Sequence, residues 1–527
     1  KTYCIDVNQF LQCLAWLDVR MKLQTSLESK LKQIDIFFNP KSIAIVGASR
    51  HLNKAGNVIF SNFATNKRRG VFRGELYPIN PNEDSILGFK CFPSLKRVPG
   101  DVESAVIVVP SKCVPDVMRE AGVKGVSAVV IISAGFGEIG NHELEDEVME
   151  IARDYGMRVL GPNCLGVFDS YSGVDMLFLP ETKVVDTGDI MVATPRPMQG
   201  SIAFVSQSGA FGAAALDYLT GSQIGISKFV SFGNKIDVAE PEILAYLGSD
   251  EKTKAILLYV ESIDRGREFM DVAKDVTRRK PIVALKSGRT MAGSRAAASH
   301  TGAMSGTGQI YDAAFSQAGV LRSTNMLEFF NIGKALAFQP PASGRNVAII
   351  TDAGGPGVMA ADECELRGVS VKVFSEETSE RFAKLIEEGV LPSFIQYRNP
   401  VDLTGSATSQ MFEEAMKIVV ADSDVHGIII IGIHHLPAIQ EDFVERIAKV
   451  STSVPKPIVA CDIGETEMAL YIRSKFEKLG IPAYRSPEEA AQAMAALISY
   501  GEYLRRSGCF NDYVEDFIIK RGSLKLT

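Results

Sequence analysis

The sequence predicts an α/β protein made of three consecutive doubly wound parallel-sheet domains. Short β-branched runs alternate with helical patterns along the chain, which is typical of right-handed βαβ units. The length of 527 residues gives room for roughly three to four domains, each with its own core. A hydrophobic content of 46%, a charged content of 23% and 45 glycines are typical of globular α/β proteins.

The first block of alternation predicts a domain over residues 34–168. Its strands are expected at 42–47, 74–80, 105–110, 128–135 and 158–163. Residues 1–33 are expected to be an N-terminal extension, part of it non-native, and the first 20 residues lack the pattern of a secretory signal. Residues 169–200 contain three prolines and no clear period, which predicts a linker.

The second and third blocks predict domains over 201–338 and 345–505. Strands are expected at 201–209, 228–234, 255–262 and 281–288 in the second, and at 346–355, 427–435 and 457–462 in the third. Both blocks open with a strand that runs into a glycine-rich helix start, and their closing segments, 319–338 and 480–499, resemble each other. We therefore expect the same device at both first turns, and a C-terminal tail over 506–527.

Composition excludes several classes of protein. The net charge of -7 gives no basic surface for nucleic acid or anionic membranes. The longest apolar run, at 427–433, is far shorter than the roughly 20 residues of a membrane helix, so it predicts a buried strand. Eight scattered cysteines without a CxxC pair indicate neither a disulfide framework nor a metal site, and we expect a cytoplasmic protein.

In doubly wound sheets the first βα turn points backbone N–H groups and the positive end of a helix at an anion. In the first block this turn is GASR at 47–50, followed by Lys54 and Gly56. It matches neither a dinucleotide fingerprint nor a P-loop, so a purely structural strand-to-helix turn remains an alternative. Arg50 and Lys54 favour a phosphate-rich ligand.

The corresponding turns of the other blocks are SQSG at 206–209 and DAGGPG at 352–357. Simple helix capping by Ser208 or Asp352 would account for each of them. Because two such turns occur in blocks that resemble each other, we expect the two helix starts to face one point and to bind an oxyanion such as phosphate from two sides.

His300 lies within AASHTGAMSG at 297–306, among residues with very small side chains. A lone histidine is more often a packed or surface residue than a catalyst. Here its surroundings leave room for the ring to move and to accept a bulky substituent. Imidazole is a good acceptor and donor of a phosphoryl group near neutral pH, so His300 is a candidate carrier.

Together these motifs resemble one family, the NDP-forming acyl-CoA synthetases, which include the ADP-forming acetate–CoA ligases and, more distantly, succinyl-CoA synthetase. The resemblance rests on SHTGAMSG, GASR with YPINP, GPNCLG, VSQSGAFG and TDAGGPG, in the order of the family's domains, and covers roughly residues 34–505. It implies a Rossmann-like CoA-binding domain followed by two flavodoxin-like, succinyl-CoA synthetase-like domains.

Site residues follow from this resemblance. His300 would be the phosphorylated histidine, and Glu261 would orient its imidazole, although a solvated glutamate at a strand end is the alternative for Glu261. Cys164 would lie near the CoA thiol, where we expect it to pack rather than react. CoA would contact Gly47, Ala48, Ser49, Arg50, Lys54, Asn80, Ser133, Ala134, Gly135 and Asn163, and phosphate would be held by Ser208, Gly209, Gly354 and Gly355.

The resemblance implies interconversion of acyl-CoA, ADP and phosphate with acid, ATP and CoA. The family also needs an ATP-grasp module, which the residues after 505 are too few to form, so we expect an α subunit. Its partner would be an ATP-grasp β subunit holding ADP or ATP with Mg²⁺, in an α2β2 assembly. A non-catalytic CoA-binding regulatory protein is the alternative. A self-contained acyltransferase would need an extra domain, for which the remaining residues are too few. The acyl group, the direction and the ADP or GDP preference stay open.

Overall fold

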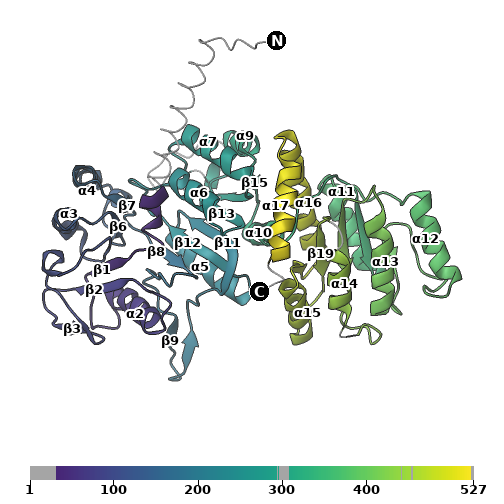
Figure 1. Cartoon of the computed structure of the whole chain (residues 1–527), viewed down its shortest axis with the longest axis horizontal. Coiled ribbons are helices and arrows are strands. Elements are labelled where there is room, and N and C mark those ends of the chain that lie inside the picture. Colours follow the sequence, from purple (N-terminus) through teal and green to yellow (C-terminus); the bar gives the residue numbers. More distant parts are fainter. Residues whose placement is uncertain (1–30, 294, 296–307, 441, 453–454, 524–527) are drawn as a thin grey trace, which may run out of the picture.

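The computed structural model describes residues 31–293, 295, 308–440, 442–452 and 455–523. It contains three larger sheets and two small hairpins (Figure 1). In each larger sheet the first of the parallel strands along the chain lies between the second and the third, as expected for a doubly wound fold. The order in which strands are added therefore reverses between β1 and β5, between β11 and β13, and between β16 and β18.

The first sheet has the order β2-β1-β5-β6-β7, and all its strands are parallel. Fully buried strands such as β1 explain why short apolar runs predicted them. The strands are β1 Ser42–Val46, β2 Glu75–Ile79, β5 Ser104–Ile107, β6 Ala128–Ile131 and β7 Arg158–Leu160, with helices α2 Ala55–Arg68, α3 Val114–Lys124 and α4 His142–Tyr155, and hairpin β3 Ser85–Ile86 and β4 Phe89–Lys90.

The second sheet has the order β15-β14-β13-β11-β12-β8 and differs from the prediction at both edges, where neither strand was expected. Strand β8, at the boundary between the expected first domain and linker, pairs antiparallel with β12. The strands are β8 Gly166–Asp169, β11 Gln199–Ser206, β12 Ile226–Ser231, β13 Ala255–Val260, β14 Ile282–Lys286 and β15 Leu321–Arg322, and the helices are α5 Gly209–Gly221, α6 Glu240–Ser249, α7 Gly266–Thr277, α9 Gly308–Ala318 and α10 Met326–Phe338.

The third sheet has the order β17-β16-β18-β19-β20 and is parallel throughout. Residues expected to form only a tail fold into helix α17, Phe510–Ser523. The strands are β16 Val347–Thr351, β17 Val401–Asp402, β18 Gly427–Ile431, β19 Ile458–Cys461 and β20 Ala483–Tyr484, and the helices are α11 Gly354–Leu366, α12 Glu376–Glu387, α13 Ser409–Ala421, α14 Phe443–Ser451, α15 Glu467–Lys478 and α16 Pro487–Arg506.

The segment predicted as a linker contains a hairpin, β9 Thr182–Val184 and β10 Ile190–Val192. Its side chains are exposed on both strands, in keeping with its projection below the second sheet in Figure 1. Within the remaining part of that segment, Arg196 pairs with the buried Asp175 at 2.7 Å. The segment is tied to α2, where Asn62 donates to the carbonyl oxygen of Leu177 at 2.9 Å.

The second and third sheets share one apolar cluster, which includes residues of both sheets and of helices α10 and α16. These two helices lie side by side at the junction (Figure 1). From α10, Lys334 donates to the carbonyl oxygen of Ala483 at 2.6 Å and pairs with Glu477 at 2.7 Å. Tyr484 in turn donates to the carbonyl oxygen of Asn331 at 2.9 Å. The junction is therefore packed and hydrogen-bonded like a domain interior.

Candidate functional site

The predicted GASR turn lies at the switch point of the first sheet. Gly47 has a φ of 96°, and a Cβ at this position would lie 2.6 Å from the carbonyl oxygen of Val108, directly after β5. A Cβ on Gly56, in the first turn of α2, would collide with the carbonyl oxygen of Gly47. Glycine at both positions thus lets the turn approach β5 and α2 closely, at the edge where doubly wound sheets bind ligands.

Polar side chains fix the shape of this turn. Asn80 donates to the carbonyl oxygen of Ala48 at 2.7 Å, and Asn57 donates to that of Ser49 at 2.8 Å. Arg50 lies 2.6 Å from the Glu83 carboxylate, so part of its charge is already balanced within the protein. Lys54 is exposed at the N-cap of α2.

Four more predicted residues, at the ends of β6 and β7, gather beside the turn. The hydroxyl of Ser133 donates to the carbonyl oxygen of Val109 at 2.5 Å, and the carbonyl oxygen of Ser133 accepts from the N–H of Asn163 at 3.0 Å. Ala134 and Gly135 continue the same loop, with Gly135 at a φ of 108°. The structure therefore brings the predicted residues of the first domain to one edge of one sheet.

Glu138 anchors this loop and was not predicted. Its carboxylate accepts from the N–H of Gly135 at 2.5 Å and from the side chain of Asn234 at 2.7 Å. Burial favours a higher pKa for Glu138, but these hydrogen bonds outweigh it and the pKa is lowered overall. Asn163 donates to Asn234 at 3.3 Å, so the loop is tied to the segment that follows β12.

The segment 161–165 leads from the first sheet to the first turn of α5. The N–H of Leu165 donates to the Ser231 hydroxyl at 3.2 Å, and a Cβ on Gly209 would lie 3.4 Å from the Leu165 side chain. Cys164 is buried, and burial raises its pKa to about 12, so its thiol stays protonated at neutral pH. The expectation that Cys164 packs rather than reacts fits this environment.

At the switch point of the second sheet, Ser208 caps helix α5. Its hydroxyl accepts from the N–H of Phe211 at 3.3 Å, as the capping alternative expected, and Gly209 opens the helix. Ser206 donates to the carbonyl oxygen of Ser208 at 2.7 Å. The start of α5 is therefore a capped N-terminus whose next N–H groups point beyond the carboxyl edge of the sheet.

Gln207 links the carboxyl ends of β11 and β13, the neighbouring strands at this switch point. Its side-chain oxygen accepts from the N–H of Glu261 at 2.8 Å and from the N–H of Ser262 at 3.1 Å. Its own N–H donates to the carbonyl oxygen of Tyr259 at 3.1 Å. Gln207 thus fixes the backbone of Glu261 relative to the start of α5.

Glu261 is 8% exposed, so the alternative of a solvated strand-end glutamate is wrong. The hydroxyl of Tyr259 donates to its carboxylate at 3.3 Å. Lys286 lies at the end of the neighbouring β14. Burial lowers the pKa of Lys286, and the negative charge of Glu261 partly offsets this lowering. A buried carboxylate beside a helix N-terminus has the surroundings of an acid–base or orienting group.

The switch point of the third sheet departs from the capping alternative. Helix α11 begins at Gly354 with Ala353 as its N-cap, and alanine has no side-chain acceptor. Asp352 instead turns inward, where one oxygen accepts from the N–H of Ile433 at 3.0 Å. Burial raises the pKa of Asp352 to about 7. A Cβ on Gly354 would lie 2.7 Å from a carboxylate oxygen of Asp402, so the α11 turn has acidic neighbours.

His300, the proposed phosphoryl carrier, lies outside the described residues. The structure brings together the predicted residues at the edge of the first sheet, and it places Ser208, Gly209 and Glu261 at the second switch point. Gly354 and Gly355 lie at the separate third switch point. Their common role with the α5 turn therefore stays a prediction.

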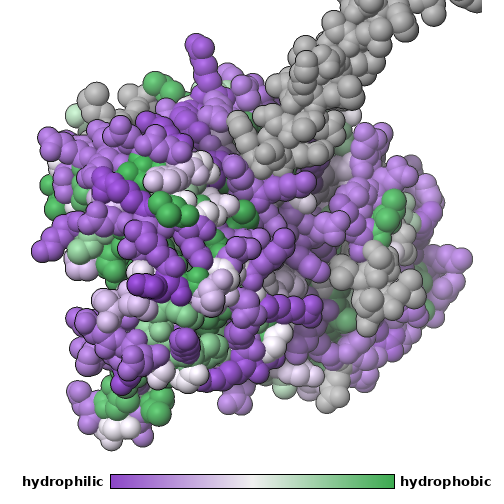
Figure 2. Space-filling model, turned by 60° about the vertical axis from the view of Figure 1, so that its left-hand side comes forward, coloured by the Kyte–Doolittle hydropathy of each residue, from purple (hydrophilic) through white to green (hydrophobic). Residues whose placement is uncertain are grey.

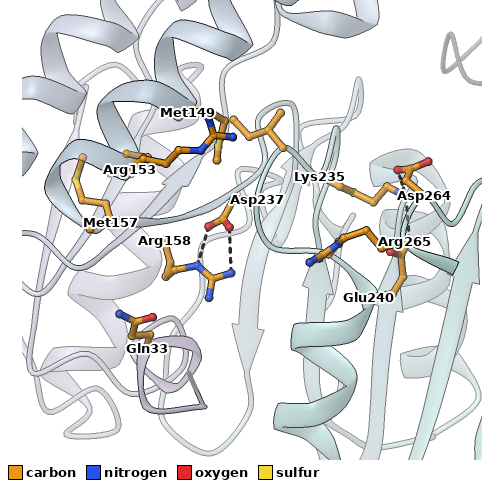
Figure 3. Close-up of a pocket in the computed structure, with 14 residues that line it drawn as sticks. Gln33, Met149, Arg153, Met157, Arg158, Lys235, Asp237, Glu240, Asp264 and Arg265 are labelled. Carbon is orange, nitrogen blue, oxygen red and sulfur yellow. Dashed lines mark hydrogen bonds and ion pairs between the residues drawn. The ribbon is translucent and has the colours of Figure 1, made fainter. Parts of the chain in front are cut away.

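A cavity of about 560 Å³ lies between the first and second sheets, away from the predicted residues (Figure 3). Arg158 points at Asp237 and binds it through two hydrogen bonds of 2.8 and 3.0 Å. Lys235 pairs with Glu240 at 3.0 Å and with Asp264 at 3.2 Å. Because its acidic and basic groups largely neutralise each other, this cavity is less suited to a phosphate-rich ligand than the GASR turn.

Several polar residues at these edges were not predicted. Gln207 lies inside the SQSG motif, which predicts a helix start but no separate role for this side chain. His434 and Asp462 lie at the carboxyl ends of the predicted strands 427–435 and 457–462, and a polar residue after a buried strand is the signal that could have identified them. Their pairing depends on the order of strands in the sheet, which the sequence does not reveal.

The face drawn in Figure 2 is mainly hydrophilic, and its hydrophobic residues form small separate groups. Within the part of the chain that the structure describes, no helix combines the length and the apolar character needed to cross a lipid bilayer. The exposed hydrophobic side chains include Val184, Ile190 and Val192 of the projecting hairpin.

Three family models match the chain in the order of the three sheets. A CoA-binding domain model matches residues 41–169. A model described as the flavodoxin domain of succinyl-CoA ligase matches residues 199–336, and a ligase-CoA domain model matches residues 347–505.

The chain is 39% identical to the α subunit of ADP-forming acetate–CoA ligase II of Pyrococcus furiosus, over 88% of this chain and 97% of the relative. It is 38% identical to ADP-forming acetate–CoA ligase I of Archaeoglobus fulgidus, over 88% of this chain but 63% of that longer protein. The structure of the dinucleotide-forming acetyl-CoA synthetase 1 of Ca. Korarchaeum cryptofilum, in complex with phosphate and ADP, matches with a TM-score of 0.80 and 35% identity, over 90% of this chain and 98% of that one. The chain therefore belongs to the NDP-forming acyl-CoA synthetase family, which includes the ADP-forming acetate–CoA ligases.

Proposed function

We propose that the chain is the α subunit of an ADP-forming acyl-CoA synthetase that acts on a small carboxylic acid and its CoA thioester. The observation that carries this proposal is the course of segment 161–165. It runs from the edge that holds the GASR turn to the first turn of α5, where Leu165 lies against Gly209. A thioester whose CoA part occupies the first edge would thereby present its acyl carbon close to phosphate at α5.

Each protein group has a defined task in this reaction. Phosphate held at the α5 turn attacks the thioester carbon, the C–S bond breaks, and CoA leaves with an acyl phosphate formed. A nitrogen of His300 then attacks the phosphorus, and the acid leaves as its carboxylate. Finally the terminal oxygen of ADP takes the phosphoryl group from His300. Positioning and charge stabilisation by helix N-termini suit this chemistry.

Glu261 would hold the imidazole of His300 by accepting from one ring N–H, which leaves the other nitrogen unprotonated for attack. Gln207 supports this role because it fixes the Glu261 backbone. Gly354 and Gly355 would supply backbone N–H groups to the same anion. The acidic neighbours of the α11 turn make that part of the proposal depend on a compensating positive charge.

The partner would be a β subunit with an ATP-grasp fold that holds ADP or ATP with Mg²⁺, in a cytoplasmic α2β2 assembly. Two relatives support a separate nucleotide module. One is named as an α subunit and is matched over 97% of its length, and another with a whole-enzyme name extends well beyond the matched part. We assign no metal ligand to this chain.

The deciding assay measures ATP formation from acetyl-CoA, ADP and phosphate, by this chain with and without an ATP-grasp partner subunit. We expect turnover only from the mixture. Labelled ATP and Mg²⁺ should give an acid-labile, base-stable phosphohistidine in the complex, lost in His300→Ala and kept in the control His142→Ala, an exposed histidine on α4. Label retained in His300→Ala would refute the carrier.

CoA binding tests the first edge independently of turnover. Calorimetry on the chain alone should show CoA binding that weakens in Arg50→Ala and in Lys54→Ala, since both lie at the GASR turn. Lys183→Ala, an exposed lysine on β9, is the matched control and should bind like the unaltered chain. Equal affinity in all four proteins would show that CoA binds elsewhere, and binding without turnover would favour the regulatory alternative.

A further inference from the structure

The segment 233–236 lies between β12 and α6 and packs against residues 161–163, which follow β7. The N–H of Asn234 donates to the carbonyl oxygen of Pro162 at 3.0 Å. Gly233 has a φ of 54°, and a Cβ at this position would collide with the same carbonyl oxygen. The segment is therefore fixed at the place where the first and second sheets meet.

Asn234 supports the loop of the first domain that is expected to contact CoA. Its side-chain amide donates to the carboxylates of Glu138 and Glu145, at 2.7 Å each. Glu138 in turn accepts from the N–H of Gly135 at 2.5 Å. The side-chain oxygen of Asn234 accepts from Asn163 at 3.3 Å. The shape of this loop thus depends on a side chain that belongs to the second domain.

Lys235, the next residue, supports the turn that carries Glu261. Its ammonium group donates to the carbonyl oxygen of Ser262 at 2.9 Å, and Ser262 directly follows Glu261. Gln207 accepts from the N–H groups of both Glu261 and Ser262. The backbone of the turn is therefore held through its N–H groups by Gln207 and through a carbonyl oxygen by Lys235.

The environment of Lys235 is costly for a lysine. Its side chain is 3% exposed and pairs with Glu240 and Asp264 at the wall of the cavity in Figure 3. Its φ of 58° is uncommon and strained for a residue other than glycine. A buried ion pair adds little net stability compared with well-packed apolar side chains. These costs favour a role for the ammonium group other than stability.

We propose that Asn234 and Lys235 are positioning residues that align the two halves of the proposed site. Asn234 positions the loop that is expected to contact CoA, and Lys235 positions the turn that carries Glu261. Each acts through its hydrogen bonds to other protein groups. Because the two residues are adjacent in one fixed segment, the CoA edge and the acid keep a constant relative placement. This inference rests on the proposed function and adds two residues to it.

The test for Lys235 combines Lys235→Met with Glu240→Gln, because Lys235→Met alone would leave the Glu240 carboxylate buried without its cationic partner. Glu240→Gln alone is the matched control, since it removes the same ion pair and keeps the ammonium group on Ser262. Rapid-quench labelling of the reconstituted complex with ATP and Mg²⁺ measures phosphohistidine formation. We expect the double variant to be about 10- to 100-fold slower, since a small displacement of an acting group has such an effect. The control should match the unaltered protein.

The test for Asn234 uses Asn234→Ala, with Asn511→Ala, an exposed asparagine on α17, as the matched control. Calorimetry on the chain alone should show that CoA affinity falls about 5-fold in Asn234→Ala, the worth of one hydrogen bond. Phosphohistidine formation from ATP should stay unchanged in this variant. The double variant at Lys235 should show the reverse, with slow labelling and unaltered CoA affinity. A merely structural role would not separate the two measurements.

Normal labelling of the double variant would show that Lys235 only balances Glu240, and unaltered CoA affinity in Asn234→Ala would overturn the role of Asn234. Parallel losses in both measurements would also overturn the inference, because they indicate general structural damage. If the unaltered complex forms no phosphohistidine, the proposed function fails. Hydrogen exchange at residues 261–263 of the chain alone then still tests Lys235. Faster exchange in the double variant than in Glu240→Gln is expected, and equal exchange would contradict its role.

Discussion

The second and third switch points use the same backbone device with different side chains. In both, a hydroxyl at the end of the first strand donates to a carbonyl two residues on, from Ser206 at 2.7 Å and from Thr351 at 2.9 Å. In both, the next side chain accepts from the N–H of the partner strand, through Gln207 and Asp352. The sheet registers align these residues as equivalents, so the two first turns share one backbone arrangement, while their common binding of an oxyanion stays a prediction.

The two switch points differ in the side chains that follow this shared backbone arrangement. By the same registers, the position of Glu261 in the second sheet corresponds to that of Ile433 in the third. The acid of the second sheet therefore has an apolar counterpart in the third. The third sheet carries its polar groups one residue and one strand further on, at His434 and Asp462. Topology therefore fixes where a site lies, and a few side chains decide which charge it presents to a ligand.

The largest expected effect concerns the acid of the second switch point. Glu261→Gln should slow phosphorylation and turnover by about 10²–10⁴, because the charge and orientation supplied to the imidazole are lost. Asp462→Asn in the third sheet should reduce turnover at saturating phosphate by far less. Rapid-quench labelling of both variants measures this contrast, and near-normal labelling of Glu261→Gln would remove the proposed asymmetry.

The next effect is on stability and depends on pH. Because burial raises the folded pKa of Asp352 to about 7, folded protein binds more protons than unfolded protein between about pH 4 and pH 7. Ionisation of Asp352 therefore lowers the free energy of unfolding progressively across this window. Above pH 7 the total loss is at most about 4 kcal/mol. Asp352→Asn should unfold at higher urea than the unaltered chain at pH 8, and by a smaller margin at pH 5. A margin independent of pH would show that Asp352 is ionised throughout.

A smaller effect is expected at Gln207, the neutral counterpart of Asp352. Gln207→Ala leaves the N–H groups of Glu261 and Ser262 without their acceptor, at a cost of about 2 kcal/mol. Gln207→Glu retains an acceptor and is the matched control. Unfolding midpoints and hydrogen exchange at residues 261–262 measure the loss, and faster exchange in the control alone would contradict this assignment.

The smallest effect concerns the helix caps. Ser208→Ala should destabilise the protein by about 1 kcal/mol because α5 loses its side-chain cap, whereas Ala353→Ser should add a cap to α11 and stabilise it by a similar amount. Ala353 already has extended backbone angles suited to this position. Opposite shifts in the unfolding midpoint are expected, and shifts of the same sign would show that the two turns are not equivalent.

The sequence predicts most of the fold because buried parallel strands are continuous apolar runs, as in the run at 427–431. It misses the two-residue edge strands β15, β17 and β20, which are too short to produce a pattern. It also misses β8, since pairing with β12 depends on packing between distant segments.

The site is predicted as far as local sequence determines it. Glycine-rich turns after strands identify the three edges, and Ser208 caps its helix as expected from residue type. Asp352 is an equally good capping residue but does not cap α11. Its carboxylate instead accepts a hydrogen bond from the N–H of Ile433, which lies 81 positions further along the chain. His434 and Asp462 meet for the same reason, through the neighbouring positions of β18 and β19 in the sheet.

The apolar cluster shared by the second and third sheets has a consequence for how this protein is made. Phe204 and Phe330 share that cluster with Ile429 and with Leu497 of α16, which is synthesised almost three hundred residues after Phe204. A nascent chain must therefore carry the second sheet with part of its apolar surface uncovered until α16 leaves the ribosome, and such surface is what chaperones bind. Ending synthesis before residue 487 should yield a protein that aggregates, even though the whole second sheet is present.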